Sequence, residues 1–117
     1  MPLFTFRREN RLNKKKDISD IFSLGNSFAN ESFAVYFKKS VGETSKLCVI
    51  ISKKNVKKSV ERSRIKRLVK EFFRLNKHNF TTAAELIVIT RRKHKIVKYS
   101  DAERSLTYIL KNFGLLK

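Results

Sequence analysis

The chain has 117 residues, the length of one small domain, and 41% of them are hydrophobic, so we expect a folded protein rather than a disordered one. Lys and Arg outnumber Asp and Glu by 28 to 10, a formal net charge of +18, which favours a polyanionic partner: nucleic acid, an anionic membrane surface or an acidic protein. A single cysteine excludes an internal disulfide, and the chain shows neither an apolar run of transmembrane length nor a signal-peptide pattern, so we expect a cytoplasmic protein.

The first third of the chain predicts an arm, a helix and two strands. Residues 1–12 mix Phe with Arg without a clear period, which is typical of an extended or flexible arm. Apolar residues at 18, 21 and 22 have helical spacing, and Gly25 is placed to end that helix as its C′ residue. Residues 26–28 predict a short edge strand, and the alternating residues 32–38 predict a longer strand.

The middle third predicts a buried strand and a basic helix. Residues 47–52 form a continuous apolar run, which indicates a central strand with both faces buried. Ser59 begins the next helix, where its hydroxyl can cap free backbone N–H groups, and we expect this helix to end near Asn76. Within one arc of about 120°, this helix carries its core-facing residues Ile65, Leu68, Val69, Phe72 and Leu75. The opposite side carries the basic residues Arg62, Lys66, Arg67, Lys70 and Arg74, with Arg64 near its edge.

The last third predicts another central strand and a closing helix. Residues 85–90 are apolar and are followed at once by a cluster of Lys and Arg. Ser100 and Glu103 have the spacing of a capping box, and Gly114 is placed to end the helix that follows. The order of elements predicts a single α+β domain spanning residues 1–117, with a sheet of three or four strands covered by helices.

Few residues suit an autonomous active site or a metal centre. We interpret His78 and His94 as surface histidines and Cys48 as a core residue, since three such residues without the usual spacing do not make a zinc site. The carboxylates are scattered, and Glu61, Glu71 and others have local roles at helix starts or in ion pairs, so no carboxylate cluster for a metal-dependent nuclease is visible. We therefore predict no catalytic residue and no metal ligand in the protein.

The basic residues are concentrated in one part of the chain. Residues 46–74 contain eleven Lys and Arg and two Glu, a net charge of +9. A merely solvated helix face mixes both signs, whereas one dominant sign is typical of a surface that neutralises phosphates. Phe22 and Tyr36 are candidates for stacking on unpaired bases if they are exposed, and core residues if they are not.

The segment Arg62-Ser63-Arg64-Ile65-Lys66-Arg67, preceded by Lys53-Lys54, resembles the Arg-Asn-Arg-Ile-Lys-Arg signature of the bacterial ribonuclease P protein subunit. The resemblance extends over most of the chain and includes residues 11–12, 17–18, 22, 25–27, 33–36, 86–89 and 91. It implies an α-β-β-β-α-β-α fold, a mostly antiparallel sheet and a left-handed βαβ crossover around the basic helix.

The resemblance also implies a function, in which an RNA subunit uses Mg²⁺ to remove the 5′ leader of precursor tRNA. The protein would be a non-catalytic monomer in a 1:1 complex with that RNA. It implies contacts to the RNA subunit from Lys53, Lys54, Lys57, Lys58, Arg62, Ser63, Arg64, Lys66, Arg67, Lys70 and Arg74. It implies a cleft for the precursor leader lined by Ile18, Phe22, Tyr36, Lys53 and Arg67.

Three positions depart from the family pattern. Ser63 replaces the usual Asn and lacks the donor and acceptor pair of an amide. Ile18 replaces the usual Phe, so it offers apolar contact without stacking, and residues 55–58 form a longer loop without the usual Gly. Two alternatives stay open: a general RNA-binding or ribosome-associated protein without a nuclease partner, and a small nuclease with its own carboxylate-bound metal.

Overall fold

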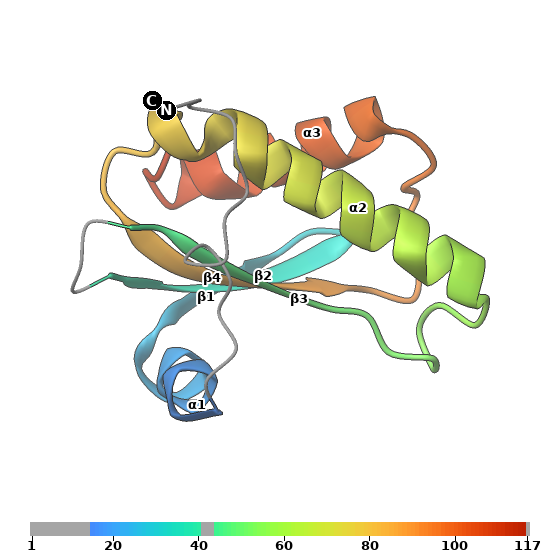
Figure 1. The fold of residues 1–117 in the computed structure, drawn as a ribbon, viewed down its shortest axis with the longest axis horizontal. Coiled ribbons are helices and arrows are strands. Elements are labelled where there is room, and N and C mark those ends of the chain that lie inside the picture. The colour runs from blue at the N-terminus through green and yellow to red at the C-terminus, as the bar shows by residue number, and fades with distance from the viewer. Residues whose placement is uncertain (1–14, 41–43, 117) are drawn as a thin grey trace.

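A computed structural model describes residues 15–40 and 44–116, and in this part of the chain four strands form one sheet with helices on both faces (Figure 1). The predicted arm of residues 1–12 lies outside the described residues. The elements, in chain order, are α1 (Lys15–Leu24), β1 (Asn26–Ala29), β2 (Phe33–Lys39), β3 (Lys46–Ile50), α2 (Ser59–Asn76), a short 3₁₀ helix η2 (Lys77–Asn79), β4 (Ala84–Thr90) and α3 (Tyr99–Asn112). The predicted α-β-β-β-α-β-α order is confirmed.

The sheet has the order β1-β2-β4-β3. β1 pairs with β2 and β2 pairs with β4 in antiparallel fashion, whereas β3 pairs with β4 in parallel. The predictions of a β1 edge strand and a central β4 are confirmed, but the prediction of a central β3 is wrong, because β3 is the other edge. One side of β3 packs into the core under α2 through Leu47, whereas Cys48 and Ile50 on its other side are only partly buried.

The β3–α2–β4 connection has the left-handed sense that the resemblance implied. In Figure 1 both strands run from left to right, β3 lies nearer the viewer than β4, and α2 lies above them. Nearly all such parallel connections are right-handed, so this crossover is a distinctive feature of the fold. It places the basic helix along the β3 edge of the sheet.

The main core lies between the sheet and the pair α2 and α3. Phe33, Val35 and Phe37 point from β2 into this core, as their alternation predicted. The predicted apolar arc of α2 needs a correction, because Phe73 is buried while Leu75 is half-exposed. Phe73 turns inward because Phe80, which follows η2, packs edge-on against it with ring centroids 5.8 Å apart.

Helix α1 covers part of the opposite face of the sheet (Figure 1). Its Ile21 is fully buried together with Ile87 of β4. Gly25 follows the helix, as expected, but without the positive φ of a C′ glycine. Its role is close approach, since a Cβ at Gly25 would lie 2.5 Å from the carbonyl oxygens of Ile21 and Phe37.

The capping of α2 and α3 differs from the prediction. Helix α2 begins at Ser59 and ends at Asn76, as predicted, but no side chain caps it, so the capping role expected of the Ser59 hydroxyl is wrong. Helix α3 begins one residue before Ser100, so Asp101 accepts hydrogen bonds from the backbone N–H groups of Val97 and Lys98 at 3.0 Å. These bonds lower the pKa of the Asp101 carboxyl.

The end of α3 follows the prediction. Gly114 has a φ of 74°, and the N–H groups of Gly114 and Leu115 donate to the carbonyls of Lys111 and Leu110, the two bonds of a Schellman motif. No helix within residues 15–40 and 44–116 is both long and apolar enough to span a bilayer.

Candidate nucleic-acid interface

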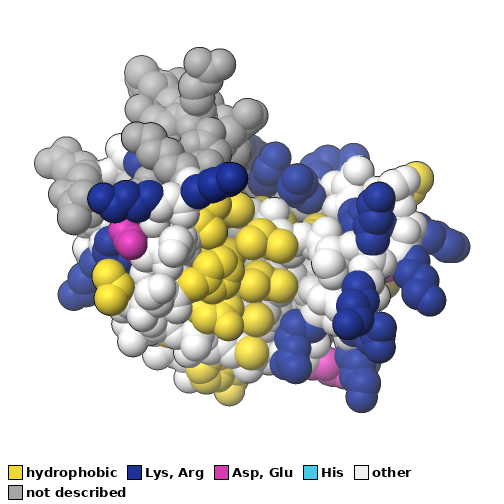
Figure 2. All heavy atoms as spheres, turned by 90° about the horizontal axis from the view of Figure 1, so that it is seen from below, with side chains coloured by type: hydrophobic (Ala, Val, Ile, Leu, Met, Phe, Trp, Pro, Cys, Tyr) yellow, Lys and Arg dark blue, Asp and Glu magenta, His cyan; other side chains and the backbone are white. Residues whose placement is uncertain are grey.

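An apolar surface lies beside α1 on the face of the sheet away from α2. Partly buried side chains pack there against Ile21 and Ile87, and Phe22 contacts one of them, Tyr36. We call these side chains the apolar patch: Ile18, Phe22, Tyr36, Cys48, Ile50 and Ile89. Figure 2 shows hydrophobic side chains gathered on this face, with Lys and Arg side chains at its edges. A surface of this composition suits unpaired bases held by stacking and apolar contact, with the flanking cations near the backbone phosphates.

The aromatic pair of the patch joins α1 to β2. The rings of Phe22 and Tyr36 meet edge to face with centroids 4.9 Å apart. Phe22 is 42% exposed and Tyr36 is half-buried, so the alternative that Phe22 is a core residue is wrong. The structure brings three predicted leader-cleft residues together, since Ile18 lies one helical turn before Phe22 on α1.

Cys48 lies in the patch on β3, a strand that packs against α2. Burial raises the pKa of its thiol, and the positive charge of Lys66 on α2 acts in the opposite direction. Lys53 is exposed and lies three residues beyond Ile50, where the chain leaves the patch.

The predicted RNA-contacting residues differ in how far their side chains are exposed to solvent. The exposed residues are Lys53, Lys54, Lys57, Lys58, Ser63, Lys66 and Arg67, and the half-buried ones are Arg62, Arg64, Lys70 and Arg74. Arg74 forms an ion pair with Glu71, as expected from their spacing, and this hydrogen bond lowers the pKa of Glu71. The expected phosphate-contacting surface is thus mainly exposed Lys together with Arg67.

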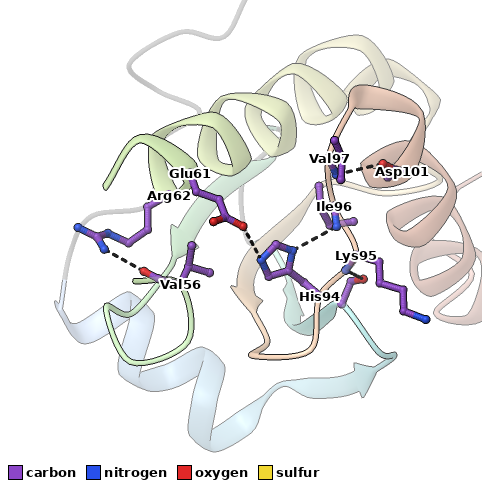
Figure 3. A network of polar contacts seen from close by, with 9 residues as sticks. Val56, Glu61, Arg62, His94, Lys95, Ile96, Val97 and Asp101 are labelled. Atoms are coloured by element: carbon purple, nitrogen blue, oxygen red, sulfur yellow. Dashed lines mark hydrogen bonds and ion pairs between the residues drawn. The ribbon is translucent and has the colours of Figure 1, made fainter. Parts of the chain in front are cut away.

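Arg62 has a structural role that the helical pattern does not show. Its Nη1 donates to the carbonyl oxygen of Val56 at 2.8 Å (Figure 3). The same Nη1 donates to the carbonyl oxygen of Lys57 at 2.8 Å, and the two bonds hold the loop before α2. Residues four apart on a helix are offset by about 40°. A stripe of such residues therefore winds around the helix, and Arg62, its first member, faces the loop rather than solvent.

Arg67 lies on a different flank of α2 from Lys66. It lines a shallow hollow with Leu68, Glu71, Leu75 and Tyr99, the first residue of α3. The structure does not group Arg67 with the apolar patch. Its role at the leader cleft stays a prediction, while its exposure suits a phosphate contact on the outer face of α2.

The family model described as ribonuclease P matches residues 6–114, which is most of the chain. This chain belongs to the ribonuclease P protein family. Curated relatives named ribonuclease P protein component include one from Desulfosudis oleivorans, 37% identical over 106 residues that cover 91% of this chain and 87% of the relative. Another, from Clostridium botulinum strain Langeland, is 36% identical over 109 residues that cover 92% and 97%.

Solved ribonuclease P proteins have the same fold. The Staphylococcus aureus RNase P protein aligns with a TM-score of 0.82 at 30% identity, over 92% of this chain and 98% of that one. The Thermotoga maritima RNase P protein aligns with a TM-score of 0.76 at 32% identity, over 87% and 96%. A further S. aureus structure, with a TM-score of 0.84 at 30% identity, is of an RNase P protein mutant with defective mRNA degradation activity.

Sequence reasoning missed two residues of this ribonuclease P family member. The interpretation of His94 as a surface histidine is wrong, because its side chain is 9% exposed and its Nε2 lies 3.3 Å from Oε1 of Glu61 (Figure 3). The Nδ1 of His94 accepts a hydrogen bond from the backbone N–H of Ile96. Folding brings together groups that lie 33 residues apart, and no local pattern signals the contact. His78 is exposed, as predicted.

Asn55 is the second missed residue. Its Nδ2 donates to the carbonyl oxygen of Thr90 at 3.1 Å, while its backbone N–H donates to Oγ of Ser52. The longer loop without glycine is therefore held by its own side chains. Among the described residues, no three His, Cys, Asp or Glu side chains converge as they would to hold a metal ion.

Proposed function

We propose that this protein is the protein subunit of ribonuclease P and assists RNA-catalysed removal of the 5′ leader from precursor tRNA. It binds the catalytic RNA subunit through the basic surface of α2 and its preceding loop, and it binds the leader on the apolar patch. The observation that carries the proposal is that one small fold holds two chemically different surfaces, the apolar patch on one face of the sheet and the exposed cations of α2 and its preceding loop. One protein therefore contacts two RNAs at once.

The contribution of the protein is electrostatic and positional. Exposed Lys and Arg neutralise phosphates of the RNA subunit and release condensed counterions. The apolar patch holds the leader in a fixed place relative to that RNA, and holding two reactants in the correct geometry lowers the entropic part of the barrier. We assign the Mg²⁺ that supports hydrolysis mainly to the RNA subunit. We further propose a 1:1 protein–RNA complex in the cytoplasm.

Reconstitution tests this assignment against the two alternatives. The purified protein, the RNA subunit and their mixture are each incubated with precursor tRNA at moderate Mg²⁺. We expect cleavage at the 5′ end of the mature tRNA sequence to increase strongly in the mixture and the protein alone to be inactive. Cleavage by the protein alone, on precursor tRNA or on an unstructured mRNA, would support a small nuclease. A mixture no more active than the RNA alone would support a general RNA-binding protein.

The leader site is tested with Tyr36→Ala. Stacking of an aromatic side chain on a base contributes about 1–3 kcal/mol, so we expect the reconstituted complex to bind precursor tRNA about tenfold more weakly. Affinity for mature tRNA, which has no leader, stays nearly unchanged. The matched control is Tyr108→Ala, since Tyr108 also packs against a phenylalanine, Phe28, but lies on α3, outside the patch. Equal losses for precursor and mature tRNA would show that Tyr36 does not contact the leader.

A further inference from the structure

Two basic segments lie at the same end of the sheet, one after β3 and one after β4. These strands are parallel neighbours, so the chain leaves both of them at that end. β3 is followed by the approach loop, residues 51–58, with Lys53, Lys54, Lys57 and Lys58. β4 is followed by a segment that we call the second basic loop, residues 91–95, which contains Arg91, Arg92, Lys93 and Lys95. The proposed contacts of α2 do not account for this second group.

Side-chain bonds join the second basic loop to α2 and its approach loop. Asn55 of the approach loop donates to the carbonyl oxygen of Thr90, the last residue of β4, at 3.1 Å. Glu61, in the first turn of α2, contacts the largely buried His94 at 3.3 Å (Figure 3). A further bond links the backbone N–H of Lys95 to Oγ of Ser32. The second basic loop is therefore held in place relative to the start of α2.

Two of the four cations of the second basic loop are bonded within the protein, and two are not. Arg91 donates through Nη1 to the carbonyl oxygen of Asn30 at 2.8 Å. Lys95 forms an ion pair with Glu31 at 3.3 Å. Arg92 and Lys93 are exposed and have no bonded partner among the described residues. The loop thus uses its outer cations for its own structure and presents the two central ones to solvent.

The surrounding charge leaves this pair uncompensated. The carboxylates that the structure places on these segments already have partners: Glu61 contacts His94, Glu31 pairs with Lys95, and Asp101 accepts from the backbone N–H groups of residues 97–98. Among the described residues, no carboxylate is bonded to Arg92 or Lys93. Two adjacent cations on an anchored loop, next to another cationic loop, repel one another in the free protein. A phosphate backbone that crosses both loops removes that repulsion and releases counterions.

We infer that Arg92 and Lys93 form a second contact with the backbone phosphates of the RNA subunit, continuous with the surface of α2. This inference rests on the proposed function. We assign the contact to the RNA subunit rather than to the leader because the loop is fastened to the first turn of α2 and leads into α3, whereas the apolar patch lies on the opposite face of the sheet.

The test compares Arg92→Ala/Lys93→Ala with a control that loses the same charge elsewhere, Lys39→Ala/Lys111→Ala. Lys39 pairs with Ala84 where β4 begins, at the opposite end of the sheet from the two basic loops. Lys111 lies in the last turn of α3, and both side chains are exposed. Binding to the RNA subunit is measured over a salt series. For Arg92→Ala/Lys93→Ala we expect a loss of affinity of about tenfold or more and a slope of log K against log salt that is smaller by about 1–2, because each phosphate contact contributes roughly 0.7–0.9.

The control double variant is expected to keep the wild-type slope. An unchanged affinity and slope for Arg92→Ala/Lys93→Ala would overturn the inference, and so would a loss equal to that of the control. A loss seen only when the preformed complex binds precursor tRNA would overturn the assignment to the RNA subunit. Wild-type protein in the same series distinguishes failure of the proposed function from failure of this inference. If the wild-type protein does not bind the RNA subunit, the proposed function fails. If the wild-type protein binds and the variant binds equally well, only this inference fails.

Discussion

At the scale of single residues, the sequence predicts which side chains are charged but not which partners they meet. Lys53, Lys57 and Lys66 are exposed, as a basic segment leads one to expect. Arg62 and His94 could not be assigned correctly, because their partners depend on how the helix winds and on how distant segments fold together. Two of the three arginines of the signature, Arg62 and Arg67, consequently differ in role although the sequence presents them as equivalent.

We predict that Arg62→Ala and Arg67→Ala both weaken binding to the RNA subunit but differ in stability. Arg62→Ala removes two charge-assisted hydrogen bonds to the loop carbonyls, so we expect it to lower the free energy of unfolding by about 1 kcal/mol. Arg67→Ala removes an exposed side chain from the outer face of α2 and changes stability little. Urea unfolding of both variants beside filter binding checks this. Equal midpoints for the two variants would contradict the structural role of Arg62.

At the scale of elements, periodicity predicts the type of each helix and strand better than its place. The apolar runs of β3 and β4 look alike in sequence, yet one is an edge strand and the other is central. The difference arises from the strand order, in which β4 lies between β2 and β3, and no local pattern contains that long-range pairing. The cap of α3 was similarly displaced, because the helix start at Tyr99 is set by packing of the preceding loop as well as by capping propensity.

The position of α1, and with it the apolar patch, depends on Gly25. A Cβ at this position would meet two backbone carbonyl oxygens at 2.5 Å, and neither can move without shifting α1 or β2. We expect Gly25→Ala to lower the free energy of unfolding by about 2–3 kcal/mol. Because α1 must move away from β2, the Phe22–Tyr36 contact is lost too, and the preference of the complex for precursor over mature tRNA falls.

Gly114→Ala is the matched control for this prediction. Gly114 has a positive φ but open space around its Cα, so alanine there costs about 1 kcal/mol of backbone strain. It lies at the end of α3, away from the patch, and the substrate preference is expected to stay at the wild-type value. Thermal unfolding and substrate binding of both variants are measured together. A Gly25→Ala protein that keeps the wild-type substrate preference would show that the place of α1 does not set leader binding.

At the scale of the whole molecule, most of the net charge of +18 falls within two connected regions. Half of it, +9, falls within residues 46–74, and the second basic loop adds four cations beside the start of α2. The sequence could predict the first concentration because it is continuous in the chain. It could not predict the second, which joins the first only through the parallel pairing of β3 with β4. The folded protein therefore carries a large positively charged surface with few carboxylates to balance it.

This arrangement predicts that small polyvalent anions stabilise the free protein. Anions that bind the native surface but not the unfolded chain add RT ln(1 + [L]/Kd) to the free energy of unfolding, which is about 1.4 kcal/mol at ten times Kd. We expect sulfate at millimolar concentration to raise the thermal midpoint by several degrees over chloride at the same ionic strength, which controls for simple screening. Arg92→Ala/Lys93→Ala should reduce this difference, because it removes two of the uncompensated cations at the joined loops. A midpoint in sulfate no higher than in matched chloride would show that the native fold tolerates its charge without bound anions.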